Sequence, residues 1–355
     1  MATPRHLSPS ANHRYLFDQL TPELAYPAGG ADAWRRQLRA KVGELVCLPD
    51  RVDGALNVEH LWERPDELGT ITKIVFTAEP YCDVVGYFCV PHAAAPPYPV
   101  VICLQGHSTG MHNSIARDID DETSPIDVPG DRDFALGAMR RGYAALCIEQ
   151  RSFGYRAEHE QEQVSPHGCH DAAMQALLLG RTLVGERVFD VDRGLDYLAE
   201  RGDVDMGRVG VLGNSGGGTV SIYAAALLDR IRFAVPSCSL ATFADSIGRI
   251  YHCADNYIPG LARWADLPDV LGLFAPRPLV VVAGRDDPIF PLASVQAAYD
   301  TVARVYSDAG AADRCTLVVG QGGHRFYADA AWNALADVLA PASGSARGGQ
   351  PATRR

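Results

Sequence analysis

Four absences limit what this 355-residue sequence can be. Basic residues are outnumbered, since 32 Lys and Arg stand against 43 Asp and Glu and give a formal net charge of −11. A nucleic acid or an anionic membrane surface attracts clustered Lys and Arg, so we expect neither as a partner. Long hydrophobic runs are also missing: the uncharged stretch over residues 84–116 is broken by four prolines and by Gly106 and Gly110, which argues against a membrane span.

The sequence also lacks paired cysteines and a recognisable leader. Its nine cysteines are scattered, with no C-x-x-C pair, and the first thirty residues contain no charged region followed by an apolar core. Scattered cysteines in a chain of this size are typical of buried thiols in a reducing compartment. We therefore expect a cytoplasmic protein.

What the sequence does contain is an alternation of strand-like and helix-like segments. Residues 14–45 have a helical pattern, and we expect residues 1–60 to form an N-terminal helical extension. Over residues 61–340, short apolar runs alternate with amphipathic helical patterns. This order predicts an α/β fold with a mostly parallel central sheet and helices on both faces. Residues 341–355 are rich in Gly, Pro, Ser and Arg, which predicts a disordered tail.

One stretch, GNSGG from Gly213 to Gly217, combines a lone serine with closely spaced glycines. An apolar strand-like run precedes it, and a helix-like pattern follows it. A G-x-S-x-G pattern in this setting is typical of a nucleophile elbow, a tight turn that presents the serine hydroxyl at the end of a strand. We expect Ser215 to be a nucleophile; the alternative is a glycine-rich turn with an incidental serine.

A serine hydroxyl needs a general base, and the base needs an acid that orients it. Both partners should follow the serine along the chain, each in a loop after a later strand. His324 follows the apolar run CTLVVG and is the predicted base. Asp286 and Asp287 both follow PLVVVAG; we choose Asp287 as the acid and expect Asp286 to act as a cap or to make a surface contact.

An oxyanion hole requires two backbone N–H groups, one of them from the residue after the nucleophile. That residue is Gly216. The loop QGHSTG follows the strand-like run PVVICL, and Gly106 allows a sharp turn there. We therefore expect the backbone N–H of His107 to be the second donor.

Taken together, these stretches resemble the α/β-hydrolase superfamily, in particular its dienelactone-hydrolase-like and acetyl-xylan-esterase-like branch. The resemblance covers roughly residues 60 to 340 and rests on YPVVICLQGH, GYAALCIEQRSFG, VDMGRVGVLGNSGGG, APRPLVVVAGRDDPIFP and GGHRF. It implies a Ser215–Asp287–His324 triad, an oxyanion hole at His107 and Gly216, and hydrolysis of carboxylic esters, often with small acyl groups, without metal or organic cofactor.

Two positions depart from the family pattern. Gln105 stands where the family commonly has histidine, so the hydrogen bonding beneath the oxyanion loop must differ. The nucleophile is serine, whereas true dienelactone hydrolases carry cysteine. The serine favours ordinary ester cleavage over the dienelactone reaction.

An irregular segment, residues 236–269, lies between two predicted core strands. Insertions at this point of the fold typically roof the active site, so we interpret the segment as a substrate cap; a packed structural excursion is the alternative. Possible substrate contacts are Gln105, Tyr251, Tyr257 and Trp264.

Two histidine-containing stretches, HSTGMH (His107 to His112) and HGCHD (His167 to Asp171), raise the question of a metal site. Neither is matched by a second pair of ligands at the spacing of zinc sites. The sequence therefore predicts no bound metal.

The prediction is a serine esterase that cleaves a small-molecule ester through an acyl-enzyme on Ser215. The same triad would also allow amide hydrolysis, as in a peptidase, or acyl transfer to an alcohol, and these alternatives stay open. A non-catalytic binding scaffold is disfavoured, because such proteins usually lose a triad member and all three residues are present. No oligomeric state is predicted.

Overall fold

The computed structural model describes residues 5–340, apart from residues 28, 30, 52–53, 108 and 158–168. The predicted disordered tail, residues 341–355, lies outside the described residues.

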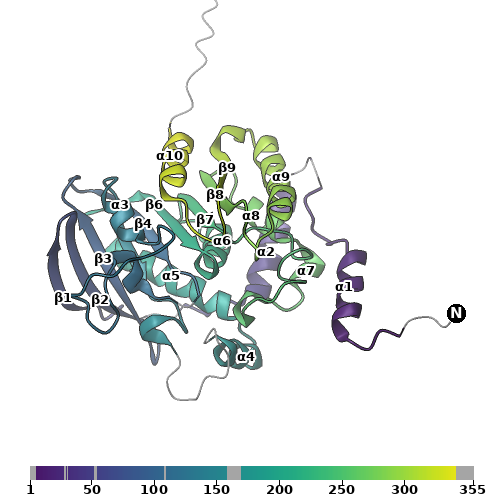
Figure 1. The fold of residues 1–355 in the computed structure, drawn as a ribbon, viewed down its shortest axis with the longest axis horizontal. Helices are drawn as coiled ribbons and strands as arrows, with labels where there is room; N and C mark the ends of the chain where they lie inside the picture. Colours follow the sequence, from purple (N-terminus) through teal and green to yellow (C-terminus); the bar gives the residue numbers. More distant parts are fainter. Residues whose placement is uncertain are drawn as a thin grey trace, which may run out of the picture.

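A nine-stranded sheet runs through the centre of the molecule, in the order β1-β2-β3-β5-β4-β6-β7-β8-β9 (Figure 1). Three pairings, β1–β2, β2–β3 and β3–β5, are antiparallel. The other neighbours pair in parallel, which confirms the prediction of a mostly parallel sheet. The strands are β1 Glu59–Asp66, β2 Gly69–Glu79, β3 Cys82–Pro91, β4 Tyr98–Leu104, β5 Ala144–Ile148, β6 Val204–Asn214, β7 Phe233–Ser237, β8 Leu279–Gly284 and β9 Cys315–Gly320.

Helices cover both faces of this sheet, as the sequence predicts. The α-helices are α1 Pro9–Gln19, α2 Ala31–Val46, α3 Phe134–Met139, α4 His170–Leu178, α5 Leu183–Glu200, α6 Gly216–Leu227, α7 Leu261–Trp264, α8 Leu267–Gly272, α9 Leu292–Asp308 and α10 Ala328–Leu339. Short 3-10 turns are η1 Met111–Ile115, η2 Gly154–Arg156, η3 Ala254–Asn256 and η4 Ala312–Arg314.

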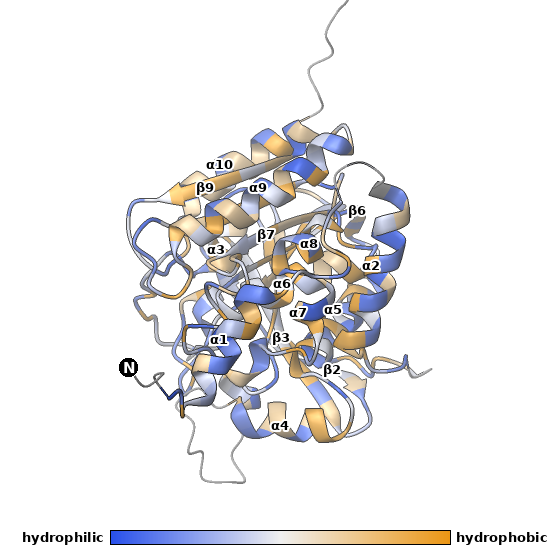
Figure 2. Ribbon diagram, turned by 90° about the vertical axis from the view of Figure 1, so that its right-hand side faces the viewer, coloured by the Kyte–Doolittle hydropathy of each residue, from blue (hydrophilic) through white to orange (hydrophobic). Residues whose placement is uncertain are grey.

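The two largest hydrophobic clusters of the described residues lie on opposite faces of the sheet, because successive side chains of a strand point to opposite sides. Along β4, Val100, Ile102 and Leu104 belong to one core, whereas Val101 and Cys103 belong to the other. The first core includes side chains of α2, α5, α6, α8 and α9, and the second includes those of α3 and α10. Apolar residues accordingly gather on the central strands, while the outer helices α2 and α9 show both colours (Figure 2).

The parallel strands bring several loops to one edge of the sheet. The strands β4, β6, β8 and β9 run in the same direction, so their carboxyl ends meet at the same edge. The loops that follow them begin at residues 105, 215, 285 and 321. Open α/β sheets build their binding sites at this edge.

Two details of the N-terminal region differ from the sequence prediction. The helical pattern over residues 14–45 is interrupted: α1 ends at Gln19 and α2 begins at Ala31, with Pro22 and Pro27 in the connection. The predicted boundary at residue 60 lies inside β1, which was not predicted as a strand. β1 is an edge strand of mostly charged and polar residues with Pro65 near its end, and such strands lack the apolar alternation of a buried strand.

The N-terminal region packs against the segment 236–269. The backbone N–H groups of Glu23 and Leu24 donate to the carbonyls of Arg263 and Trp264, at 2.9 and 2.7 Å. The backbone N–H of Tyr26 donates to Asp269 Oδ1 at 2.9 Å. The connection between α1 and α2 therefore supports the outer side of this segment.

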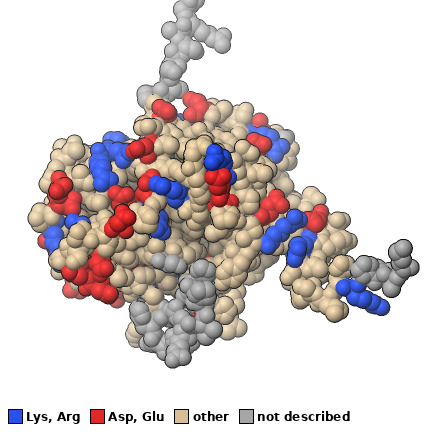
Figure 3. Space-filling model, viewed as in Figure 1, with Lys and Arg blue, Asp and Glu red and all other residues tan. Residues whose placement is uncertain are grey.

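The surface carries both signs of charge. On the face shown in Figure 3, acidic and basic side chains are interspersed. None of the described helices has the length and apolar character that crossing a membrane would require.

Candidate active site

Ser215 lies in a strained turn between β6 and α6. Its backbone has a φ of 56° and a ψ of −121°, a conformation that residues with a side chain rarely adopt. The backbone N–H of Ser215 donates to the carbonyl of Ser237 at 2.9 Å, which fixes the turn on β7. A Cβ added to Gly217 would overlap the carbonyl oxygen of Leu104 at the end of β4. The glycine thus allows the start of α6 to approach the sheet closely.

His324 and Asp287 form a hydrogen-bonded pair beside this turn. His324 Nδ1 lies 2.7 Å from Asp287 Oδ2. The other carboxylate oxygen, Oδ1, accepts the backbone N–H groups of Ile289 and Phe290 at 2.8 and 3.2 Å. Burial raises the pKa of Asp287, but His324 and these two amides outweigh it and hold the pKa below its ordinary value. An ionised Asp287 accepts the Nδ1 proton and leaves Nε2 of His324 as the basic nitrogen.

Asp286, the alternative acid, points elsewhere. Its side chain is 57% exposed and pairs with Arg285 at 3.1 Å. The structure therefore brings Asp287, and not its neighbour, against His324.

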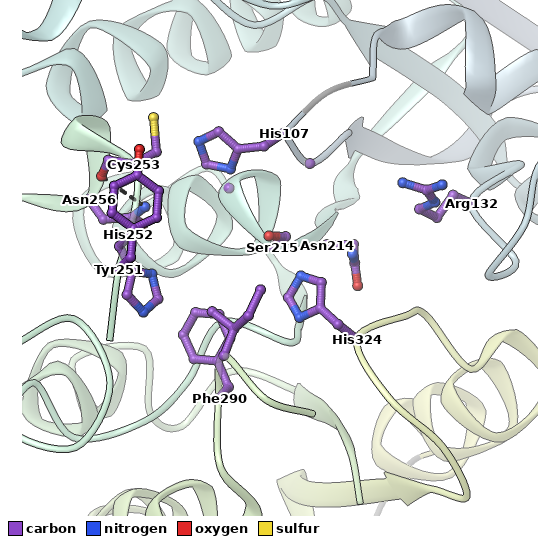
Figure 4. A pocket seen from close by; sticks show the side chains of 13 residues that line it. His107, Arg132, Asn214, Ser215, Tyr251, His252, Cys253, Asn256, Phe290 and His324 are labelled. Carbon is purple, nitrogen blue, oxygen red and sulfur yellow. Dashed lines mark hydrogen bonds between the residues drawn. The ribbon is translucent and has the colours of Figure 1, made fainter. Parts of the chain in front are cut away.

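Ser215 and His324 line one cavity of about 230 Å³ (Figure 4). Its wall residues are Gly106, His107, Arg132, Asn214, Ser215, Gly216, Tyr251, His252, Cys253, Asn256, Ile289, Phe290 and His324. The ring of Phe290 stacks on the ring of His324, with centroids 6.0 Å apart and an angle of 13° between the planes. The predicted nucleophile and base thus share a small, partly enclosed space.

The loop after β4 packs directly on the serine turn. A Cβ on Gly106 would lie 2.9 Å from the carbonyl oxygen of Asn214 and 3.0 Å from the Cβ of Ser215. A Cβ on Gly216 would lie 2.8 Å from the ring of His107. His107 and Gly216, whose backbone N–H groups are the predicted oxyanion donors, therefore lie side by side in the cavity wall.

The imidazole of His107 belongs to a buried charged network that sequence reasoning missed. Its Nε2 lies 3.0 Å from Asp255 Oδ2 and 3.1 Å from Oδ1. Asp255 also pairs with the fully buried guanidinium of Arg187. Burial opposes protonation of His107, but the carboxylate of Asp255 prevails and raises the pKa of His107 to about 9. The only sequence signal was Arg187 itself, a charged residue among apolar positions of a predicted helix.

Among the four predicted substrate contacts, the structure places Tyr251 in the cavity wall and the other three elsewhere. Gln105 is 2% exposed, and its Nε2 donates to Ser114 Oγ and to the carbonyl of Arg132, each at 2.8 Å. Tyr257 donates its hydroxyl to the carbonyl of Ile247 at 3.1 Å and lines a different cavity, next to α1.

Trp264, the fourth predicted contact, faces the N-terminal region, where Lys41 Nζ lies 4.4 Å from its ring centroid. Four residues of the proposed cap segment contribute to the wall of the cavity around Ser215: Tyr251, His252, Cys253 and Asn256. The helical end of the segment, formed by α7 and the start of α8, packs on α2 instead.

The cavity also contains residues that were not predicted as contacts. Arg132 lies on the side opposite to residues 251–256 (Figure 4), and its Nε donates to the carbonyl of Pro129 at 2.9 Å. His252 Nε2 bonds to Ser246 Oγ at 2.9 Å, and burial lowers the pKa of His252 to about 4. His252 is therefore neutral near pH 7. Neither residue stands in a motif, because each reaches the cavity from a loop.

Two groups of described side chains have potential metal-ligating atoms within 4.8 Å of one another. Cys238, Asp287 and His324 form the first group, which contains the acid–base pair described above. The second group consists of His107, Cys169, Cys253 and Asp255. His167, from the HGCHD stretch, lies outside the described residues.

Glu149, at the end of β5, holds two loops near the site. Its carboxylate accepts the backbone N–H groups of Met111, at 3.0 Å, and Tyr155, at 3.2 Å. Burial raises the pKa of Glu149 to about 7, although these amides and Arg156 act in the opposite direction.

Comparisons with known proteins agree on a family of hydrolases. The model of the Abhydrolase family matches residues 4–305. A Bacillus subtilis (strain 168) protein named as a hydrolase, YtaP, is 26% identical over 295 residues, which are 82% of this chain and 92% of that protein.

Solved structures of esterases share the fold. A Bacteroides fragilis NCTC 9343 protein named as an acetyl xylan esterase aligns with a TM-score of 0.72 at 18% identity, covering 89% of this chain and 83% of that chain. A glucuronoyl esterase from Solibacter usitatus aligns with a TM-score of 0.63 at 18% identity, covering 90% and 96%. These likenesses confirm the α/β-hydrolase fold that the sequence resemblance implied.

The positive φ of Ser215 predicts that glycine is tolerated better than alanine at this position, which is the reverse of the order inside a helix. Ser215→Gly should be more stable than Ser215→Ala by about 1 kcal/mol, because glycine tolerates a positive φ. At Ser221, inside α6, the same pair of substitutions should show the ordinary order, with glycine less stable than alanine by about 1 kcal/mol. Urea unfolding of the four variants measures both differences. A less stable Ser215→Gly would contradict the strained turn.

The raised pKa of Glu149 predicts a pH-dependent stability. The Glu149 carboxyl binds its proton more tightly in the native state than in the unfolded state. Its contribution to the free energy of unfolding is therefore complete below pH 4.5 and is lost as the pH rises to about 7. Relative to Glu149→Gln, which does not titrate, the wild type should lose about 3 kcal/mol of unfolding free energy over this interval. Urea unfolding at several pH values tests this. If the difference in unfolding free energy between wild type and Glu149→Gln did not change with pH, the prediction would be refuted.

Proposed function

The chain belongs to the Abhydrolase family, and from this premise we propose that it hydrolyses carboxylic esters through an acyl-enzyme on Ser215. The observation that carries the proposal is the 2.7 Å contact between His324 Nδ1 and the buried carboxylate of Asp287, with His324 in the wall of the cavity that contains Ser215. An oriented base beside a serine held in a tight strand–helix turn is the arrangement that activates a hydroxyl nucleophile.

In the proposed mechanism, His324 Nε2 takes the hydroxyl proton of Ser215 as Oγ forms a bond to the ester carbonyl carbon. Asp287 stabilises the imidazolium that results. The carbonyl oxygen becomes an oxyanion and accepts hydrogen bonds from the backbone N–H groups of His107 and Gly216.

Collapse of this intermediate breaks the bond to the alcohol, which leaves with the proton from His324. Water then attacks the acyl-enzyme with His324 again as the base, and the acid product and free Ser215 are released. These steps use only protein groups and water.

The cavity favours a small acyl group. Its volume of about 230 Å³ lies below the range of about 300–1,000 Å³ that is usual for drug-sized ligands. The structural relatives are named as acetyl xylan and glucuronoyl esterases, so we propose a small ester, acetyl above all, on a carbohydrate or another small molecule. Residues 251–256 would act as the cap over it. Seven of the nine cysteines are buried, as is typical of thiols in a reducing compartment, and we propose a cytoplasmic location.

Hydrolysis of p-nitrophenyl esters tests the proposal. Across a series from acetate to octanoate, the wild type should have its highest kcat/KM on the short esters, because longer chains exceed the cavity. Ser215→Ala should lower kcat/KM by at least about 10³-fold, since it removes the nucleophile. Wild-type activity on no ester, or activity that persists in Ser215→Ala, would overturn the esterase proposal. Cleavage of the matching anilides instead would favour an amide hydrolase.

The adjacent aspartates provide a matched pair for the acid. Asp287→Asn should lower kcat by about 10³–10⁴-fold, because the amide stabilises the wrong tautomer of His324. Asp286→Asn changes the same charge one residue away, on an exposed side chain, and should change kcat less than about twofold. Both are measured on the preferred short ester. Equal effects of the two substitutions would show that Asp287 is not the orienting acid.

A further inference from the structure

A cluster of four potential metal ligands lies behind the oxyanion loop. The imidazole of His107, the thiols of Cys169 and Cys253, and the carboxylate of Asp255 each place one donor atom within 4.8 Å of all the others. In a tetrahedral zinc site, bond lengths of about 2.0–2.3 Å hold the ligand atoms about 3.3–3.8 Å apart. The 3.0 Å between His107 Nε2 and Asp255 Oδ2 is close to this spacing.

The donor set matches one class of metal. Two thiolates, one imidazole and one carboxylate are ligands that zinc accepts, whereas Mg²⁺ and Ca²⁺ prefer oxygen alone. Four protein ligands complete a tetrahedron and leave no open position, which is the pattern of structural rather than catalytic zinc sites.

Residues around the four ligands orient them further. Arg187 pairs with Asp255 and donates from Nη2 to Cys169 Sγ at 3.4 Å. Asn256 Nδ2 donates to Asp255 Oδ1 at 3.1 Å. Hydrogen bonds of this kind to ligating carboxylates and thiolates are typical of the second layer of a metal site.

The charges balance when a dication is present. His107 binds a metal only as a neutral imidazole, so it releases the proton that it carries beside Asp255. Two thiolates and one carboxylate then carry three negative charges, and a divalent metal with the guanidinium of Arg187 carries three positive ones. All of these groups are buried, and Arg187 is among the most deeply buried side chains of the described chain. A neutral total avoids the cost of an unpaired charge in the interior.

An ion also has a path to the cluster. His107 and Cys253 line the cavity around Ser215, and Figure 4 shows both on the same side of it. Cys169 and Asp255 lie behind them and are 0% and 3% exposed. The cluster is thus reached from the cavity through His107 and Cys253.

We propose that His107, Cys169, Cys253 and Asp255 bind one zinc ion, as a structural site that joins the loop after β4 to the start of α4 and to the segment at η3. The four ligands come from three distant parts of the chain, so the local C-x-x-C spacing of small zinc modules is absent. The sequence predicts no metal at the two histidine-containing stretches, HSTGMH and HGCHD. In this proposal each of them supplies one ligand: His107 comes from the first and Cys169 from the second. If the proposed function holds, the ion also fixes the residue whose backbone N–H binds the oxyanion.

Metal content tests the proposal directly. The full chain, purified without chelators, should contain about one zinc per chain by mass spectrometry of the metal. Cys169→Ser and Cys253→Ser should each reduce this at least tenfold after dialysis against a chelator, since each removes a thiolate ligand. Cys315→Ser, a buried cysteine on β9 outside the cluster, is the matched control and should keep the metal.

Cobalt supplies a second readout that needs no variant. Co²⁺ added to metal-free wild type should give the thiolate-to-metal charge-transfer band and the strong visible bands of a tetrahedral site. Zinc should then displace it. Ser215→Ala should keep the zinc while losing ester hydrolysis, so the failure of this proposal and that of the proposed function are distinguishable.

Three results would overturn the proposal. Wild type could contain less than about a tenth of a zinc per chain and show no thiolate–cobalt bands. The two cysteine variants could retain as much zinc as Cys315→Ser. Alternatively, the protein purified in air could contain a Cys169–Cys253 disulfide, seen by peptide mass mapping, in place of the metal.

Discussion

The site depends on the close packing of one backbone turn against the end of β4. Ser215 keeps its positive φ because the turn is fixed on both sides, by the hydrogen bond from its N–H to Ser237 and by contact with Gly106. Side chains larger than hydrogen on Gly106 or Gly217 would separate the turn from β4. This packing sets the serine hydroxyl and the His107 loop in the same cavity wall, and every chemical step of the proposed mechanism starts from that arrangement.

Asp255 extends the arrangement to the segment between β7 and β8. Its carboxylate contacts both His107 on the loop after β4 and Arg187 on α5. The segment that carries Asp255 is supported from outside by the connection between α1 and α2, through backbone hydrogen bonds to Arg263 and Trp264. The N-terminal region therefore contacts this segment, and none of its described residues lines the cavity.

The sequence allows prediction of those parts of the candidate site that depend on short stretches of the chain. The strand–turn–helix around Ser215, and the loops after β8 and β9 that carry Asp287 and His324, follow from short patterns and from chain order. The contacts of Arg187 with Asp255 and of Gln105 with Ser114 could not be predicted, because they join residues brought together only by the fold. β1 was missed for a different reason: an exposed edge strand such as Glu59–Asp66 needs no apolar face.

Labelling with a fluorophosphonate, which reacts with activated serine hydroxyls, tests the central claim that His324 activates Ser215. We predict one adduct per chain, located on Ser215 by peptide mass mapping. Labelling should be slowed at least 10²-fold in His324→Ala, in which the base is missing. An adduct on another residue, or equal labelling rates for wild type and His324→Ala, would contradict the claim.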